Sequence, residues 1–340
     1  MNEAIFELET ITPLFMAGAD QATAEIRAPS FRGPMRYWQR ALVGGLVGTD
    51  TEALRKVAIE ENTVFGATDT GSVVRVRIPR QLPAQHKAQL PEFKRESYGR
   101  PGSGKDYLLW SMERSGGGPK PRKYFPTGTS FPLILSARGG NEAIFQKGIA
   151  AFWLLTHLGG IGARSRRCAG SLQVTGNSQL AGSIASFLFD IPEDPLALCT
   201  GLASGIQTAR SLYGYAALPL KDANFDVLSS NTCRIWILLP GKKLWDTENL
   251  AMRYIGASLR EYRASKPIQD RKIFGLPLTG VSGKRLSSPL LLRLTKLQGE
   301  RYVGIAVVFK TNALGLKTSD YTLIEQWITQ YFPNALEVEL

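Results

Sequence analysis

The chain has 340 residues, of which 44% are hydrophobic and 21% charged, a composition that excludes a chain dominated by disorder and suits about two domains. Lysine and arginine outnumber aspartate and glutamate by 41 to 29, so the formal net charge is +12 and polyanionic partners, nucleic acid first among them, are favoured. The three cysteines form no CxxC pair, and the sequence has neither a signal-peptide pattern nor a membrane-spanning stretch. We therefore expect a cytoplasmic protein that works away from the membrane and without a metal or other cofactor.

The first half of the chain opens with clear strand and helix patterns. Residues 4–12 alternate apolar and polar side chains, as a half-buried strand does. A helix is expected to begin at Gly33-Pro34, because proline suits the first helical position. The further elements expected in this half are a helix near 51–62, a strand at 72–78, a strand at 129–136, and a helix capped by Asn141 that ends at Gly159-Gly160.

Residues 80–123 differ from their surroundings. They contain ten lysines or arginines against four acidic residues, and eleven glycines or prolines, so we interpret them as a long basic insertion. Loops of this length inside a compact domain are usually functional or mobile. The aromatic side chains of the insertion that could stack on bases are Phe93, Tyr98, Tyr107 and Trp110. The alternative is a solvated, partly ordered loop that binds nothing.

The second half of the chain shows a similar succession of strands and helices. Its expected elements are a strand near 184–190, a helix near 195–213, a strand at 234–240, a helix near 246–264, strands at 289–297 and 302–310, and a helix near 319–331. Each half mixes a few strands with helices, which predicts an α+β fold of two domains. We place the boundary between residues 178 and 179.

Two basic motifs indicate phosphate binding. The first is SFRGPMR, where a helix N-terminus would offer free N–H groups and the positive end of the helix dipole. Ser30 could donate a further hydrogen bond, and the cationic side chains on and before this helix are Arg27, Arg32, Arg36 and Arg40. A solvated basic turn would explain either motif alone, but two of them in one basic chain reinforce each other.

The second motif is the loop LGGIGARSRRCAGSL, residues 158–172, with four glycines and three arginines. Glycines let a backbone come close to a ligand, and forked guanidinium groups match phosphate oxygens. The residues predicted to contact phosphate are Gly160, Gly162, Arg164, Ser165, Arg166 and Arg167. The loop follows a helix and precedes a strand, whereas a dinucleotide-binding turn runs from strand to helix, so that function is excluded.

Catalytic chemistry finds little support in the sequence. The stretch Gly99 to Asp106 resembles a P-loop, but the aspartate stands where a magnesium-binding serine or threonine belongs. Cys168 has no evident base as a partner, and His157 at a helix end is better explained as a capping or core residue. Asp20, in MAGADQ, is the one acid that could face a basic groove.

Three stretches together resemble one protein family. They are TPLFMAGADQATAEIRAPSFRGPMRYWQRAL (12–42), HLGGIGARSRRCAGSL (157–172), and FGLPL followed by KRLSSPLLLRL (274–294). In this order, over nearly the whole chain, they resemble the signatures of the first subunit of the type III-B CRISPR Cmr effector complex, within the RAMP superfamily of guide-RNA-binding proteins.

The resemblance implies two tandem ferredoxin-like, RRM-related domains joined face to face. They would cover residues 1–178, with the insertion at about 80–123 and the Gly-rich loop at 159–171, and residues 179–340. It also implies a non-catalytic RNA-binding subunit that lies at the 3′ end of the guide crRNA, helps to capture complementary target RNA, and contacts neighbouring RAMP backbone subunits. Lys284 and Arg285, in the third stretch, are added to the expected RNA-binding residues.

Two other functions stay open at this point. One is a metal-dependent endoribonuclease, in which Asp20 would help to hold a divalent ion on the scissile phosphate. The other is a structural end-piece whose basic surface mainly docks other subunits.

Overall fold

The computed structural model describes residues 2–18, 23–81, 84–97, 102–113, 122–177, 187–216, 220–241, 243–275, 287–312 and 318–340. The elements of the first half are β1 (Asn2–Thr10), α1 (Ala28–Val47), α2 (Thr51–Phe65), β2 (Val74–Arg77), α3 (Ala84–Gln89), α4 (Gly104–Leu108), β3 (Ser130–Ala137), α5 (Glu142–Leu158) and β4 (Leu172–Asn177). Those of the second half are α6 (Pro195–Ser211), β5 (Cys233–Leu238), α7 (Glu248–Ser265), β6 (Leu290–Leu297), β7 (Arg301–Phe309), α8 (Thr318–Tyr331) and β8 (Leu336–Val338).

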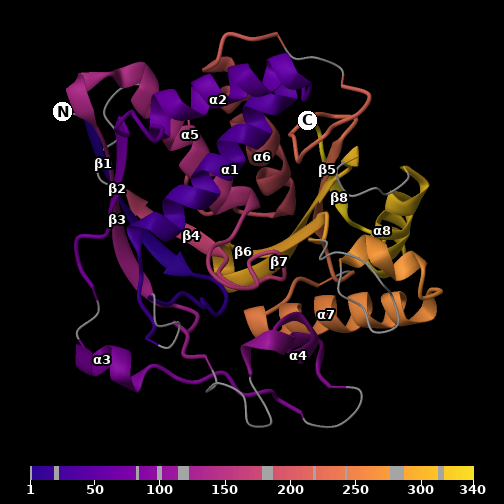
Figure 1. Cartoon of the computed structure of the whole chain (residues 1–340). Coiled ribbons are helices and arrows are strands. Elements are labelled where there is room, and N and C mark those ends of the chain that lie inside the picture. The colour runs from indigo at the N-terminus through magenta and orange to yellow at the C-terminus, as the bar shows by residue number, and fades with distance from the viewer. Residues whose placement is uncertain are drawn as a thin grey trace.

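Each half of the chain forms a four-stranded antiparallel sheet (Figure 1). The strand orders are β2-β3-β1-β4 and β6-β7-β5-β8, so the same strand order appears twice. In both halves a helix follows the first strand, a second helix follows the third strand, and the last strand pairs beside the first. This is the ferredoxin-like arrangement. The predicted α+β fold of two tandem ferredoxin-like domains is confirmed.

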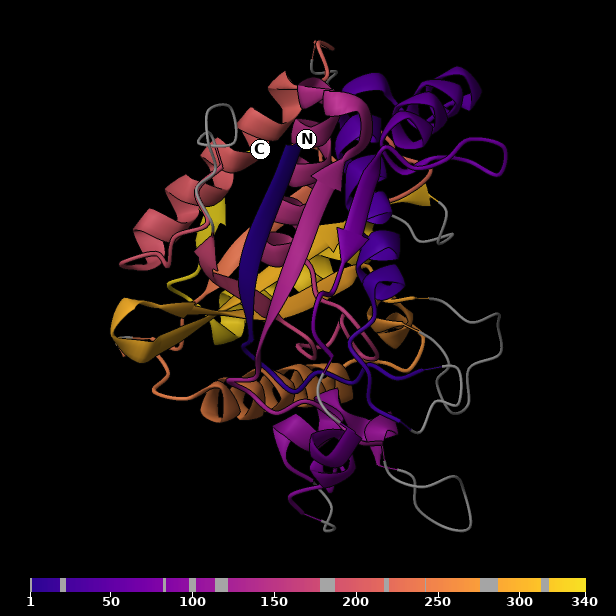
Figure 2. The same cartoon turned by 90° about the vertical axis from the view of Figure 1, so that its left-hand side faces the viewer.

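The burial of the strands shows how the two domains are stacked. Side chains of β1 alternate between buried and accessible, which is typical of a sheet with one face in solvent, and Figure 2 shows β1, β3 and β2 in front of the helices. Every residue of β7 after Arg301 is buried, which is typical of a strand covered on both faces. The helices α1, α5 and α6 lie between the two sheets (Figure 1).

The helix layer shows which faces of the two domains meet. Along α5 most side chains are buried, and Phe152 packs against Phe6 of β1 with ring centroids 4.7 Å apart. On the other side of the layer, Trp38 of α1 meets Phe309 of β7 at 6.0 Å. A helix that is apolar nearly all round must be covered all round, so the helices of the first domain occupy one face of the second sheet.

Most expected elements are confirmed, but α1 differs in its start. It begins at Ala28, with Pro29 in the first turn, whereas Pro34 lies inside the helix. The N–H of Arg27 donates to Met16 Sδ at 3.3 Å, and the N–H of Ser30 donates to the carbonyl oxygen of Arg27 at 3.0 Å. The SFRGP motif therefore does not supply the free N–H groups that were expected of a helix N-terminus there.

Two strands also differ from expectation. Residues 187–190 form no strand, and the residues before Phe187 in the expected strand near 184–190 lie outside the described residues. The first sheet is completed by β4, the strand that was expected directly after the Gly-rich loop, whereas the short strand β8 was not expected. The boundary between residues 178 and 179 also lies outside the described part of the chain and stays a proposal. No helix of the described ranges is long and apolar enough to cross a bilayer.

The basic insertion packs on the second domain. Its helix α4 approaches α7 so closely that a Cβ atom at Gly104 would lie 1.9 Å from the carbonyl oxygen of Arg253. Phe93 is buried against Phe15, so it is a core residue and not free to stack on a base, which corrects that expectation. Trp110 is 64% exposed, with the Arg95 guanidinium 5.1 Å from its ring centroid. Tyr98 lies outside the described residues.

Candidate nucleic-acid interface

The two basic motifs of the sequence meet at one groove, of about 250 Å³, which we call the loop groove. It is lined by Gly33, Pro34, Tyr37 and Trp38 of α1, by Gly159, Gly160, Ser165 and Arg166 of the Gly-rich loop (residues 159–171), and by Leu291 of β6. Gly33 faces open space, because an added Cβ atom there would have no neighbour within 4 Å. Residues more than 120 positions apart in the sequence thus form one surface.

The Gly-rich loop is held by backbone contacts to both domains. Gly162 has a φ of +79°, and a Cβ atom there would lie 2.4 Å from the carbonyl oxygen of Phe15. On the other side, the Cys168 N–H donates to the carbonyl oxygen of Leu292 in β6 at 2.8 Å, and the Leu292 N–H donates to that of Arg166 at 3.2 Å. The glycine at 162 is therefore required by the approach of the protein's own backbone.

Each arginine of the loop donates to a different segment of the chain. The Nε of Arg164 donates to the carbonyl oxygen of Leu108 in α4 at 2.8 Å. The Nη2 of Arg167 donates to the carbonyl oxygen of Phe274 at 2.5 Å, and its Nη1 is buried without a partner among the described residues. Burial, together with the charges of neighbouring arginines, lowers the pKa of Arg167 to about 10, so it stays charged at neutral pH.

Arg166 is the loop arginine that lines the groove. Its Nη1 donates to the carbonyl oxygen of Ser288 at 2.8 Å, and its Nη2 donates to Asp226 Oδ2 at 3.1 Å and to the Tyr37 hydroxyl at 3.4 Å. A guanidinium has five N–H groups, so two of them have no partner in the described part of the chain. Burial opposes the charged form, but Tyr37 and Asp226 outweigh it and raise the pKa of Arg166.

The arginines of α1 face a carboxylate on α2. Arg36 and Arg40 both form ion pairs with Glu61, the second at 3.0 Å, and Glu61 is only 6% exposed. Arg32 donates to the carbonyl oxygen of Phe65 at the end of α2. One buried negative charge thus offsets part of the positive charge of these three arginines, which we call the α1 stripe. Because none of these three side chains lines the loop groove, their role toward phosphate stays a prediction.

The remaining predicted residues are placed as follows. Arg27 is the N-cap residue of α1 and Ser30 lies in its first turn, and neither lines the loop groove. Asp20, Lys284 and Arg285 lie outside the described residues. Across the described ranges, no group of three or more histidine, cysteine or acidic side chains is placed to hold a metal ion.

Cys168, near the end of the loop, is fully buried, and His157, just before the loop, is partly buried. Burial raises the pKa of the Cys168 thiol to about 12, so this thiol is not activated as a nucleophile. The His157 ring stacks on Trp153 at 4.2 Å, and its Nδ1 lies 2.8 Å from the carbonyl oxygen of that residue.

The sequence analysis missed Tyr37, which lines the groove, and Asp226, which pairs with the groove residue Arg166. Tyr37 follows Gly33 by four positions, so the helical repeat places both on one face of α1, and this signal could have found it. Asp226 reaches Arg166 across 60 residues of sequence, and no local pattern marks it.

Comparisons with known proteins agree with this fold. Residues 7–173 match the model of the RAMP superfamily. Two relatives come from Pyrococcus furiosus. CRISPR system Cmr subunit Cmr1-1 is 29% identical over 326 residues, which are 90% of this chain and 87% of the relative. CRISPR system Cmr subunit Cmr1-2 is 37% identical over 194 residues, which are 51% of this chain and 96% of the relative.

Solved structures show the same fold. The crystal structure of Cmr1 from Pyrococcus furiosus in its apo form matches with a TM-score of 0.70 at 21% identity, over 99% of both chains. A chain of the cryo-EM structure of the Type III-B Cmr-beta bound to cognate target RNA matches with a TM-score of 0.60 at 12% identity, over 97% of this chain and 99% of that chain.

The repeated ferredoxin-like fold and the family match define a RAMP-superfamily protein. Within that class the match becomes particular, since a Cmr1 relative is 37% identical over nearly its whole length. The chain belongs to the Cmr1 family of CRISPR Cmr subunits. The resemblance drawn from three stretches of the sequence is confirmed.

Proposed function

We propose that the protein is a non-catalytic RNA-binding subunit of a type III-B CRISPR Cmr ribonucleoprotein. It holds the 3′ region of the guide crRNA, helps to capture complementary target RNA, and docks on neighbouring RAMP backbone subunits. Its family membership, its net charge of +12 and the presence of a chain of the same fold in a Cmr-beta complex bound to target RNA support this proposal. The cytoplasmic location expected from the sequence belongs to the same proposal.

The observation that carries the proposal is the loop groove. It joins the two motifs that the sequence marked for phosphate binding, and it is lined by Arg166, which has two N–H groups that the described residues leave unpaired. A guanidinium is matched to phosphate oxygens, and backbone contacts of this kind position a strand without reading its sequence. Base pairing between guide and target then supplies the specificity.

The test separates phosphate binding by Arg166 from its structural contact with Asp226. Arg166→Gln and Asp226→Asn both remove the same ion pair, but only the first removes the cation. If Arg166 binds phosphate, Arg166→Gln weakens binding of unrelated single-stranded RNAs several-fold and lowers the slope of log K against log salt by about 0.7. Asp226→Asn keeps or increases the affinity. Fluorescence anisotropy at several salt concentrations measures both.

Equal losses of affinity in the two variants would refute the role of Arg166 toward RNA, because they would trace to the shared ion pair. Thermal unfolding of both variants confirms that each is folded at the temperature of the binding assay. Asp226→Asn is the matched control, since it changes the same contact from the opposite side.

The non-catalytic part of the proposal has its own test. Labelled RNA incubated with the protein and Mg²⁺ or Mn²⁺ should stay intact, for the wild type and for Asp20→Ala alike. Cleavage that the wild type shows and Asp20→Ala lacks would establish the rival function, a metal-dependent endoribonuclease.

A further inference from the structure

We propose a second RNA contact at the edge of the first sheet, where the backbone of a single-stranded segment binds along β2. This inference rests on the proposed function and extends it beyond the loop groove. The residues that carry it form the arginine strip, which consists of Arg32 of α1, Arg75 and Arg77 of β2, and Arg138 in the 3₁₀ turn that follows β3 (Arg138–Gly140).

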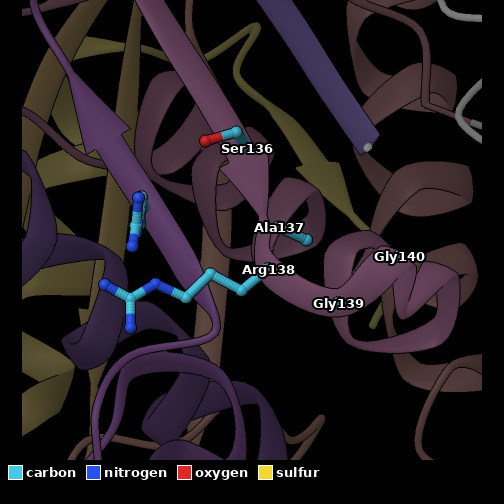
Figure 3. A pocket seen from close by; sticks show the side chains of 6 residues that line it. Ser136, Ala137, Arg138, Gly139 and Gly140 are labelled. Carbon is cyan, nitrogen blue, oxygen red and sulfur yellow. The ribbon is translucent and has the colours of Figure 1, made fainter.

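The arginine strip lies along two adjoining pockets. One, of about 430 Å³, is lined by Arg75, Ser136, Ala137, Arg138, Gly139 and Gly140 (Figure 3). The other, of about 250 Å³, lies between β2 and the first turns of α1 and is lined in part by Arg32, Arg75 and Arg77. Arg75 belongs to both pockets, and none of the described residues that line them is acidic. The two pockets therefore form one cationic path along an edge strand.

Much of this charge is not neutralised. Arg75 and Arg138 are exposed, and neither forms an ion pair with a carboxylate of the described residues. Arg77 does pair with Glu3, at 2.5 Å, and Arg32 donates to a backbone carbonyl, which leaves its charge uncompensated. Free guanidinium groups at a surface are ready donors for phosphate oxygens.

The larger pocket also offers neutral donors. Ser136 lies directly opposite Arg75 in the register of β2 and β3, and Figure 3 shows its hydroxyl on the side of the Arg138 guanidinium. Gly139 and Gly140 have φ angles of +70° and +67°, and added Cβ atoms would have no neighbour within 4 Å. The turn therefore leaves its backbone accessible. Since the lining that the structure describes includes no aromatic side chain, the strip suits a sugar–phosphate backbone and not stacked bases.

The strip and the loop groove flank the same part of one helix. Residues Ala28, Pro29 and Arg32 of α1 line the strip, whereas the next residues of α1, Gly33 and Pro34, line the loop groove. A strand that leaves the groove across the first turns of α1 reaches Arg32 and then the edge of β2. The charge on β2 also protects a sheet edge from pairing with other chains, but that role does not require Arg138, which lies beyond the strand.

The test compares Arg75→Gln/Arg138→Gln with a control that loses the same charge elsewhere, Arg55→Gln/Lys243→Gln, at two exposed positions outside both pockets. Affinity is measured for RNAs of about 5 and about 15 nucleotides, within the range of site sizes for single-strand binders. The long RNA should lose about five- to tenfold in affinity in the strip variant, and its salt slope should fall by about 1.4, the value for two phosphate contacts. The short RNA, which fits in the loop groove, should lose less than twofold.

Several outcomes would overturn the proposal. One is that the strip variant binds the long RNA with the same affinity as the control variant. If the wild type still binds both RNAs, this outcome leaves the proposed function intact. Another is an equal loss for both RNA lengths, which would contradict a path across α1. A third is a polyglutamate peptide that binds the wild type but not the strip variant while RNA binding is unchanged, since the strip would then hold an acidic protein segment. Failure of the proposed role of Arg166 in RNA binding is recognised separately, by equal losses of RNA affinity in Arg166→Gln and Asp226→Asn.

Discussion

The arginines of the Gly-rich loop and those of the arginine strip lie in different environments and have different partners. Arg164, Arg166 and Arg167 are partly buried, and each donates to a carbonyl oxygen of another segment. Arg75 and Arg138 are exposed and unpaired with any carboxylate of the described residues. The loop arginines therefore join the domains and the insertion as well as presenting charge, whereas Arg75 and Arg138 of the strip only present charge. Changes in the loop should alter stability and RNA binding together, and changes in the strip should alter RNA binding alone.

The largest expected effect lies beneath the loop, at Arg293 of β6. Its side chain is 2% exposed and donates to the carbonyl oxygens of Thr156, at the end of α5, and of Leu172, at the start of β4, the latter at 3.0 Å. Arg293→Met leaves these buried acceptors without their donor, so the free energy of unfolding should fall by about 3–5 kcal/mol. Chemical denaturation measures this loss.

Arg75→Met is the matched control for Arg293→Met. It removes an equally long cation from an exposed strand position, and the expected change is within about 0.5 kcal/mol. A loss below about 1 kcal/mol for Arg293→Met would contradict the view that an interior arginine fastens the loop to the second domain.

The next effect depends on pH and concerns His157, beside the loop. Burial, with a smaller contribution from the charge of Arg293, lowers the pKa of His157 to about 3. The unfolded chain binds the proton near the ordinary value of about 6.5, so the stability is fully present above that pH and is lost as the pH falls toward 3. The free energy of unfolding should drop by up to about 1.4 kcal/mol per pH unit in this range.

His157→Phe keeps a ring on Trp153 and removes the titration. Its denaturation midpoints, measured from pH 7 to pH 4, should therefore fall less steeply than those of the wild type. Acidic residues contribute the same pH dependence to both proteins, so the difference between the two curves reports on His157. Parallel curves would show that the histidine is not buried in its neutral form.

The fold was largely predictable, because local patterns decide it. The alternation in residues 4–12, the Asn141 cap and the apolar runs 289–297 and 302–310 all correspond to elements of the structure. The start of α1 was not predictable from Gly33-Pro34 alone, because proline is tolerated both at a helix start and, with the loss of one hydrogen bond, inside it. The stacking of helices against the second sheet depends on which surfaces meet, and sequence periodicity does not contain that information.

The candidate site was predictable only in part. Both motifs of the loop groove were recognised, since clustered glycines and arginines are a local signal. The partners of those arginines were not, because Asp226, Leu108 and Phe274 are about 55 to 110 positions away in sequence. The strip was missed for a similar reason. Arg75 sits in an ordinary strand pattern and Arg138 in a turn, and only the pairing of β2 with β3 brings them to one pocket.

The smallest expected effect concerns the α1 stripe, which is intermediate between the loop and the strip. Glu61 is buried against Arg36 and Arg40 and offsets part of their charge. Glu61→Gln keeps an amide oxygen that can accept their hydrogen bonds and removes the negative charge, so RNA affinity should rise about two- to threefold, or roughly 0.5 kcal/mol. The matched control is Glu52→Gln, which removes an exposed carboxylate from the same helix. If both variants gain equally, the increase follows net charge alone and the stripe contributes nothing specific. A gain confined to Glu61→Gln would place Arg36 and Arg40 with the arginines that serve both the fold and the RNA, because only their pairing distinguishes the two variants.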